Sequence, residues 1–187
     1  MKRILLFASG SGTNVENIIR YFQQKKTAEV VAVFCNNPKA KVIERAKNLS
    51  VDSFVFSKED LFSEIVFDKV NEFKPDLIVL AGFLLKFPQN VIAAYPNQII
   101  NIHPALLPKY GGKGMYGKHV HQAVLDNKES ETGITIHYID EHYDEGDIIF
   151  QKSISVTDCS SPEEIAAKIG KLEHEYFPQI IENLLKS

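Results

Sequence analysis

Cysteine is scarce in this sequence, and tryptophan is absent. The 187 residues include two cysteines, Cys35 and Cys159, which lie far apart with no Cys-x-x-Cys pair and no neighbouring cluster of cysteine and histidine. This usage excludes a disulfide framework and a zinc site of the ordinary spacing. Both cysteines are predicted to be free thiols.

An excess of positive charge and a long hydrophobic run are also missing. The formal charge is -3 and the pI is about 6.1, so there is no basic footprint for a nucleic-acid backbone. Only five apolar residues, Ile4 to Ala8, follow the basic start before Ser9, which is too few for a signal peptide or a membrane span. We therefore expect a cytoplasmic protein that binds neither nucleic acid nor membrane.

The composition that is present suits one globular domain. Hydrophobic residues make up 44% of the chain, enough for a single core over residues 1–187. Short apolar runs alternate with helical patterns, which is the signature of parallel strands joined by crossover helices. The prediction is a single-domain, Rossmann-like α/β fold with helices on both faces of a mostly parallel sheet.

The expected elements follow from this alternation. Strands rich in Val, Ile, Leu and Phe are predicted at Ile4 to Ala8, Val30 to Cys35, Ser53 to Phe56, Leu77 to Ala81 and Ile99 to Ile102. Helices are predicted at Asn14 to Gln24, Ala40 to Asn48, Asp60 to Phe73 and Gln89 to Tyr95.

The pattern changes after residue 103. Lys109 to Lys118 carries four glycines and three lysines in ten residues, which predicts a mobile loop whose lysines attract anions. Gly133 to Ile139 and Asp147 to Val156 then predict a late antiparallel addition to the sheet. The last helix opens on the capping box Ser161 to Glu164, and Pro178 is expected to bend or split it.

The loop Ser9 to Asn14 lies between a predicted buried strand and a predicted helix. Its glycines allow backbone N–H groups to converge at a helix N-terminus, which would hold a phosphate without a basic side chain. A dinucleotide fingerprint would need a glycine where Val15 stands, and a Walker loop would need Gly-Lys-Ser or Gly-Lys-Thr. A phosphomonoester is therefore favoured over NAD or ATP, while a plain tight turn remains the simpler alternative.

A second candidate site is Asn101-Ile102-His103-Pro104, at the end of a predicted strand. Residues two apart on a strand share a face, so Asn101 and His103 should point the same way. Ligands of open α/β sheets bind beyond the carboxyl ends of the strands. An amide beside an imidazole at that edge indicates a reactive site more than it indicates packing.

The third candidate is an acidic run with five acids in eight residues, Asp140 to Asp147. Such a run is usually a solvated turn. A histidine that works near neutral pH needs a carboxylate partner, and one acid of this run could supply it. The residues alone do not choose among these acids.

Together, these motifs resemble the glycinamide ribonucleotide formyltransferase family, folate-dependent enzymes of purine synthesis. The resemblance is carried by Asn101 to Pro108 and by Gly133 to Gly146, and it extends over nearly the whole chain. Ser9 to Asn14, Pro75 to Phe83, and Glu173-His174 with Pro178 follow the same order and spacing.

The resemblance implies a role for each matching residue. Asn101 would polarise the formyl group, His103 would be the catalytic acid or base, and Asp144 would favour its charged form. By the same similarity, Gly12, Thr13 and Asn14 would hold the substrate phosphate, and Glu173 would meet the amine end. The implied folate-binding residues are Lys58, Leu84, Leu85, Lys86, Phe87, Asn101 and Asp140. His137 is assigned a structural or supporting role.

The implied reaction moves the formyl group of 10-formyltetrahydrofolate to the amine of glycinamide ribonucleotide, with no metal. The protein would be a monomer or a homodimer. Methionyl-tRNA formyltransferases resemble the chain less, because they carry a C-terminal RNA-binding domain and this sequence ends with one helix after the core. The alternatives are a formyltransferase for another amine and a non-catalytic sensor of folate or phosphate.

Overall fold

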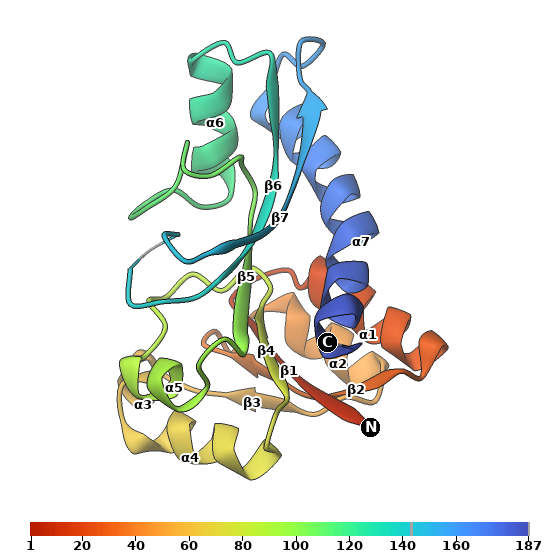
Figure 1. Cartoon of the computed structure of the whole chain (residues 1–187), viewed down its shortest axis with the longest axis vertical. Coiled ribbons are helices and arrows are strands. Elements are labelled where there is room, and N and C mark those ends of the chain that lie inside the picture. Colours follow the sequence, from red (N-terminus) through yellow and green to blue (C-terminus); the bar gives the residue numbers. More distant parts are fainter. Residues whose placement is uncertain (143, 187) are drawn as a thin grey trace. The chain divides into compact units, whose positions relative to one another are not determined.

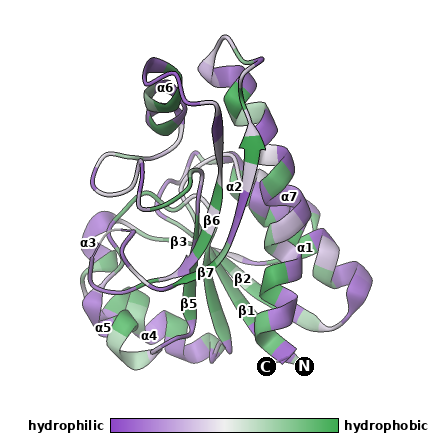
Figure 2. Ribbon diagram, turned by 45° about the horizontal axis from the view of Figure 1, so that its top comes forward, coloured by the Kyte–Doolittle hydropathy of each residue, from purple (hydrophilic) through white to green (hydrophobic). Residues whose placement is uncertain are grey.

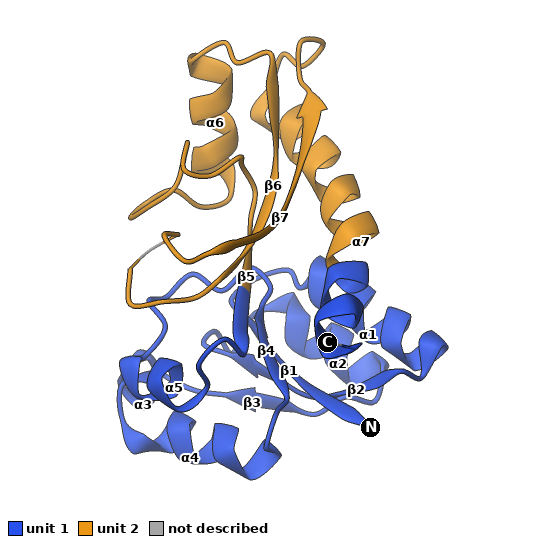
Figure 3. Cartoon of the chain, in the orientation of Figure 1, with its two compact units in different colours: residues 1–100, 178–187 blue, residues 101–177 orange. Residues whose placement is uncertain are grey.

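The computed structural model describes residues 1–142 and 144–186. Tyr143, which belongs to the predicted acidic loop, lies outside the described residues. The chain divides into two compact units, residues 1–100 with 178–187 and residues 101–177 (Figure 3). None of the described helices is long and apolar enough to cross a membrane.

The predicted α/β fold is confirmed. The strands are β1 (Lys2–Ala8), β2 (Ala28–Cys35), β3 (Ser53–Val55), β4 (Leu77–Leu80), β5 (Ile99–His103), β6 (Glu131–Tyr138) and β7 (Ile148–Ser155). They form one sheet in the order β3-β2-β1-β4-β5-β6-β7. β1 pairs in parallel with β2 and β4, and β2 pairs in parallel with β3, whereas β6 and β7 are antiparallel.

The strand order of the first unit contains a reversal between β1 and β4. The chain proceeds outward from β1 to β2 and β3 and then returns to β4 on the other side of β1. Because parallel crossovers are right-handed, this return puts the later helices on the opposite face from the earlier ones. Ligands of such sheets bind at the carboxyl ends of the strands beside the reversal. The loops after β1 and β4 are therefore the positions at which this unit would bind a ligand.

The core of the first unit is aromatic at these strand ends. Phe7 of β1 lies with its ring centroid 4.9 Å from Phe34, 5.4 Å from Phe83 and 5.0 Å from Phe87. The middle of β1 is inaccessible to solvent, the carboxyl half of β2 is buried, and both strands are largely hydrophobic there (Figure 2). Burial on both faces explains why these strands read as continuous apolar runs.

The helices of the chain are labelled in Figure 1. They are α1 (Thr13–Lys25), α2 (Lys41–Asn48), α3 (Lys58–Leu61), α4 (Glu64–Phe73), α5 (Gln89–Ala94), α6 (Lys118–Asp126) and α7 (Pro162–Lys186).

The single helix predicted at Asp60 to Phe73 is wrong, because the structure has α3 and α4 in its place. Ser57 and Asp60 form a capping box that starts the short α3. Ser63 then caps α4 by accepting a hydrogen bond from the backbone N–H of Ile65 at 3.2 Å. Serine side chains compete with a continuous helix by satisfying the free N–H groups of a new one.

The second unit contains the antiparallel pair β6 and β7, as predicted, and a helix that the sequence analysis did not assign. This helix, α6, begins at Lys118 directly after the glycine-rich loop and buries Val120, His121 and Val124 on one face. Its apolar positions are few, and two of its first four residues are histidines. That short and mixed pattern explains why no helix was predicted there.

The last helix is continuous from Pro162 to Lys186, so of the two predicted effects of Pro178, a bend or a split, the split does not occur. A proline inside a helix removes one hydrogen bond and costs about 3 kcal/mol. Its neighbours Phe177 and Ile181 are fully buried. Each such side chain contributes about 1.5–3 kcal/mol, and together they offset the cost of the proline.

At the start of α7, only half of the predicted capping box forms. Ser161 Oγ accepts from the N–H of Glu164 at 3.3 Å, but the Glu164 carboxylate accepts from Ser160 instead of from the Ser161 N–H.

Candidate functional site

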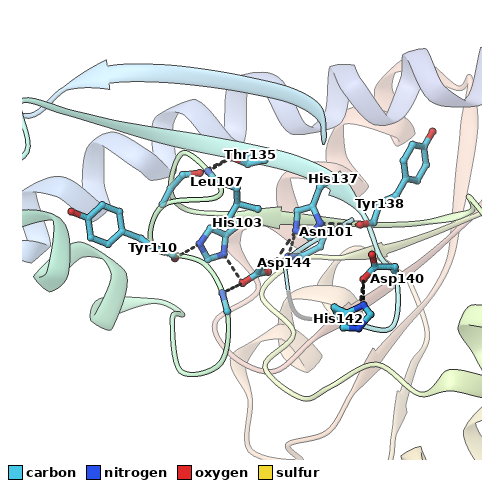
Figure 4. Close-up of polar contacts among 12 residues, drawn as sticks. Asn101, His103, Leu107, Tyr110, Thr135, His137, Tyr138, Asp140, His142 and Asp144 are labelled. Carbon is cyan, nitrogen blue, oxygen red and sulfur yellow. Dashed lines mark hydrogen bonds and ion pairs between the residues drawn. The ribbon is translucent and has the colours of Figure 1, made fainter. Parts of the chain in front are cut away.

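The second unit brings His103 and Asp144 together, as Figure 4 shows. His103 ends β5 and is 3% exposed. Its Nε2–H donates to the carbonyl oxygen of Tyr110 over 2.7 Å, and its Nδ1 lies 3.6 Å from Asp144 Oδ2. The second distance is too long for a hydrogen bond but close enough for charge attraction. Both ring nitrogens thus face oxygen atoms, one in a hydrogen bond and one at a longer distance.

Asp144 is held in place by the glycine-rich loop. The backbone N–H of Gly112 donates to Asp144 Oδ2 over 2.9 Å. A Cβ on Gly111 would lie 3.4 Å from the Asp144 Cβ and 2.5 Å from Leu107, so the loop approaches as closely as a glycine allows. Asp144 itself has φ 57, a left-handed conformation that aspartate and asparagine adopt more readily than most residues.

Asn101 is hydrogen-bonded to His137, which lies beside Asp144. Its Nδ2 donates to His137 Nε2 over 3.1 Å, while His137 Nδ1–H donates to the carbonyl of Tyr138 over 2.9 Å. This pattern fixes His137 as a neutral ring with its proton on Nδ1. Burial lowers the pKa of His137, although the Tyr138 carbonyl and the Asp144 charge oppose that shift.

Because His137 is neutral, its contact with Asp144 carries no charge on the histidine side. His137 Nε2 lies 3.7 Å from Asp144 Oδ1, which has the geometry of an ion pair only for a charged ring. Because that nitrogen accepts from Asn101, the contact is not an ion pair. The histidine instead orients the Asn101 amide, so that one of its two N–H bonds is used and the other is left for another acceptor.

Two residues that the sequence analysis missed hold the segment after His103. Thr135 Oγ1 donates to the Ala105 carbonyl over 2.7 Å and accepts from the Leu107 N–H over 3.0 Å. Gln151 Nε2 donates to the Leu107 carbonyl and to Thr135 Oγ1, each over 2.9 Å. The available signal was the alternation on β6, which places Thr135 and His137 on one face of the strand.

The predicted phosphate loop belongs to the first unit. Ser9 follows β1, and its Oγ donates to Asn36 Oδ1 over 2.6 Å and accepts from the Leu84 N–H over 3.0 Å. Gly12 precedes α1 with φ 74, and no side chain caps this helix terminus. Thr13 and Asn14 form the first turn of α1. The helix dipole and the backbone N–H groups of this turn favour an anion.

The predicted folate-binding segment follows β4 in the same unit. The Ser9 N–H donates to the Gly82 carbonyl over 3.0 Å, so this segment runs beside the phosphate loop. Leu84 is 49% exposed, and Lys86 is exposed as well. Phe87 is 5% exposed and packs on Phe7 and Phe83, so its side chain belongs to the aromatic core.

The remaining predicted residues lie on other elements. Lys58 is exposed at the start of α3, Leu85 is half-buried after β4, and Glu173 is half-buried on α7. Asp140 follows β6, and its Oδ1 accepts from the His142 N–H over 2.8 Å. Cys35 and Cys159 are free thiols. Within residues 1–142 and 144–186, no cluster of three or more His, Cys, Asp or Glu side chains could hold a metal ion.

Comparison with known proteins assigns the chain to a family. The model of the formyl transferase family matches residues 2–181. The chain belongs to the formyl transferase family. Members of this family transfer formyl groups, so a donor of one-carbon units and an acceptor are the ligands that a family member requires.

Individual family members show the same similarity. The chain is 36% identical to a phosphoribosylglycinamide formyltransferase of Bacillus subtilis, over 99% of this chain and 95% of that protein. It is 30% identical to the protein of that name from Escherichia coli, over 95% of this chain and 84% of the other. A solved structure of glycinamide ribonucleotide transformylase 1 from Geobacillus kaustophilus superposes with a TM-score of 0.90, at 36% identity and 99% coverage of both chains.

Proposed function

We propose that this enzyme transfers the formyl group of 10-formyltetrahydrofolate to the amine of glycinamide ribonucleotide in cytosolic purine synthesis. Residues 1–187 would act as one catalytic domain. The observation that carries the proposal is the geometry of His103 and Asp144, 3.6 Å apart at the end of β5 with Asn101 on the same strand. The names of full-length relatives at 30% and 36% identity support the choice of substrates.

In the proposed reaction, the acceptor amine attacks the formyl carbon of the donor. A bond forms between the amine nitrogen and that carbon, and the bond from the carbon to N10 of the folate breaks. The amine loses one proton and N10 gains one, so the products are the formamide and tetrahydrofolate. His103 would carry this proton, since a positioned acid or base contributes about 10²- to 10⁴-fold to the rate.

Asn101 would stabilise the negative oxygen of the tetrahedral intermediate. One Nδ2–H is used by His137, and the second would donate to this oxygen. One such donor contributes about 10²- to 10³-fold. The charged form of His103 would act on the same oxygen, with Asp144 balancing its charge.

The hydrogen bond between His103 and Tyr110 would have to break during the proposed reaction. The Nε2–H of His103 donates to the Tyr110 carbonyl at 2.7 Å, and Nδ1 faces Asp144. The imidazole must therefore exchange the Tyr110 carbonyl for the substrate before it can transfer a proton. The loop of residues 109–118 would move for this step, as expected of a lid.

The phosphate of the acceptor would bind at Gly12, Thr13 and Asn14, and the folate beside Leu84, Leu85, Lys86, Phe87 and Asp140. The features that support the first assignment are the left-handed Gly12 and the uncapped start of α1. Phe87 would contribute its backbone to a ligand, since its side chain is buried against Phe7. Lys58 and Glu173 are the remaining proposed contacts, to acidic groups of the ligands and to the amine end.

Single-turnover formyl transfer tests the proposal. Wild-type enzyme mixed with both substrates should release tetrahydrofolate, and His103→Ala should slow this step by about 10²-fold or more. His142→Ala is a matched control, because His142 is an exposed histidine in the 140–147 run that also contains Asp144. A folded wild type that binds the folate without transfer to glycinamide ribonucleotide would indicate another amine acceptor or a sensor.

A further inference from the structure

Two consecutive carbonyl groups of the loop after β1 are held by helix α2. The Gly10 carbonyl accepts from the backbone N–H of Val42 over 3.2 Å. The Ser11 carbonyl accepts from Arg45 Nε over 2.8 Å. All four residues belong to the first unit, so this contact is internal to it.

The direction of these carbonyls determines the direction of the next N–H groups. In a trans peptide the C=O of one residue and the N–H of the following residue point opposite ways. Bonding of the Gly10 and Ser11 carbonyls to α2 therefore turns the N–H groups of Ser11 and Gly12 away from α2. Successive N–H groups on one side of a loop form an anion-binding concavity.

Close packing between the loop and α2 leaves little freedom in this arrangement. A Cβ on Gly12 would lie 2.4 Å from Val42 Cγ2, and Gly12 has φ 74. Any other residue at position 12 would therefore clash as well as strain the backbone. The loop lies directly on the first turn of α2, and Arg45 reaches it from one turn further along.

Arg45 is itself fixed by an acidic partner on the helix that the loop enters. Its Nη1 pairs with Glu16 Oε2. The other oxygen of Glu16 accepts from Arg20 at 2.8 Å. Hydrogen bonds from Arg20 and then Arg45 lower the pKa of Glu16. One guanidinium thus connects the loop, α1 and α2.

We propose that Arg45 is a positioning residue for phosphate binding. It holds the Ser11 carbonyl against α2, which keeps the N–H groups of Ser11 and Gly12 directed toward the phosphate. Arg45 acts through the loop, because its Nε and Nη1 are used by Ser11 and Glu16. The inference rests on the proposed function, in which this loop holds the phosphate of glycinamide ribonucleotide.

The test compares steady-state constants of Arg45→Gln with those of the wild type. The KM for glycinamide ribonucleotide and the inhibition constant of inorganic phosphate should each rise about tenfold, the equivalent of one lost hydrogen bond to a charged group. The kcat and the KM for the folate should stay within about twofold. Such a split separates phosphate positioning from a general loss of structure, which would lower kcat as well.

Arg20→Gln is the matched control. This substitution removes a positive charge beside Glu16, as Arg45→Gln does, but leaves the contact between Arg45 and Ser11. It should leave both constants within about twofold of wild type. Arg45→Lys should rescue partly, because lysine keeps the charge but lacks the fork that reaches two partners. An equal rise in Arg20→Gln would show a charge effect and overturn the proposal.

Two further outcomes keep the test decisive. If Arg45→Gln does not fold, Glu16→Gln releases the guanidinium without removing it, and a smaller rise of the same two constants is expected. Unchanged constants in the folded variants would overturn the positioning role. If the wild type shows no formyl transfer, the proposed function fails, and titration of inorganic phosphate into wild type and Arg45→Gln by calorimetry still tests Arg45.

Discussion

The backbone N–H of Gly112 donates to Asp144 Oδ2 over 2.9 Å, and the same carboxylate oxygen lies 3.6 Å from His103 Nδ1. A glycine-rich loop thereby sets the position of a carboxylate that lies within 4.0 Å of His103. Two residues earlier, the Tyr110 carbonyl accepts from the opposite side of the imidazole. The loop therefore orients both members of the proposed acid–base pair through its backbone.

Substitution of Gly112 tests this relationship. Gly112 has φ 91, and Gly114 has φ 87, and neither has an atom within 4 Å of a built Cβ. Alanine at either position imposes a similar backbone strain of about 1–3 kcal/mol. Only Gly112→Ala should displace the N–H from Asp144, and its kcat/KM should fall about tenfold, whereas Gly114→Ala should stay within about threefold. Equal losses in a formyl-transfer assay would contradict this role.

Asp144→Asn tests the charge beside His103. Asparagine tolerates the left-handed conformation at φ 57 and can still accept from Gly112, so the fold should be kept. Without the negative charge the protonated imidazole is less favoured, and the limb of the pH–rate profile that depends on His103 should move to lower pH. Phosphate inhibition should be unchanged.

Asp140→Asn is the control for that experiment, because Asp140 lies in the same loop and is only half-buried. Its pH–rate profile should match that of the wild type. An unchanged profile in Asp144→Asn would move the partnership to Asp140 or Asp147.

Thr135→Val should destabilise the enzyme. Thr135 is completely buried, and its hydroxyl serves the Ala105 carbonyl, the Leu107 N–H and Gln151. Valine has the same shape but leaves these groups without a partner, at a cost of about 1–3 kcal/mol. Urea denaturation measures this loss. Thr132→Val makes the same exchange on the other face of the same strand and should cost less, and an equal cost would show that only the generic loss of a buried hydroxyl matters.

The buried histidine His121 should make stability depend on pH. Burial, assisted by His103, lowers its pKa from the ordinary 6.5. The unfolded chain then binds a proton below about pH 6.5 that the folded chain does not, so stability falls as pH decreases through that range. His121→Leu should therefore lose less stability than the wild type between pH 7.5 and 5.5.

Urea denaturation at the two pH values measures this difference. His121 Nδ1 has no hydrogen-bond partner in the described part of the chain, so leucine should also cost little at pH 7.5. The exposed His142 provides the control, and His142→Gln should follow the wild-type pH dependence. A pH dependence in His121→Leu that equals the wild type would show that His121 does not contribute.

Local sequence patterns were sufficient for most of the fold. The buried strands around Phe7 and Phe34 were predicted because a strand covered on both faces must be apolar throughout. Where a serine could cap a new helix, as Ser63 does, the apolar periodicity continued across the break and hid it. Pro178 does not split its helix, because burial of Phe177 and Ile181 stabilises a helix that a local rule would allow to end there.

The candidate site divides in the same way. The sequence by itself determined that Asn101 and His103 share a face at a strand end, because the two-residue period of a strand is a local property. It also determined the strand, glycine loop and helix around Gly12.

Local patterns left open which acid of the 140–147 run approaches His103; the family resemblance implied Asp144, and the tertiary structure brings it within 3.6 Å and shows that Gly112 holds it. It also decided that His137 orients Asn101 and that Arg45 reaches Ser11. These contacts join residues 32 to 41 positions apart, and no local periodicity encodes them. They depend on how strands and loops pack, which is set by burial of the whole core.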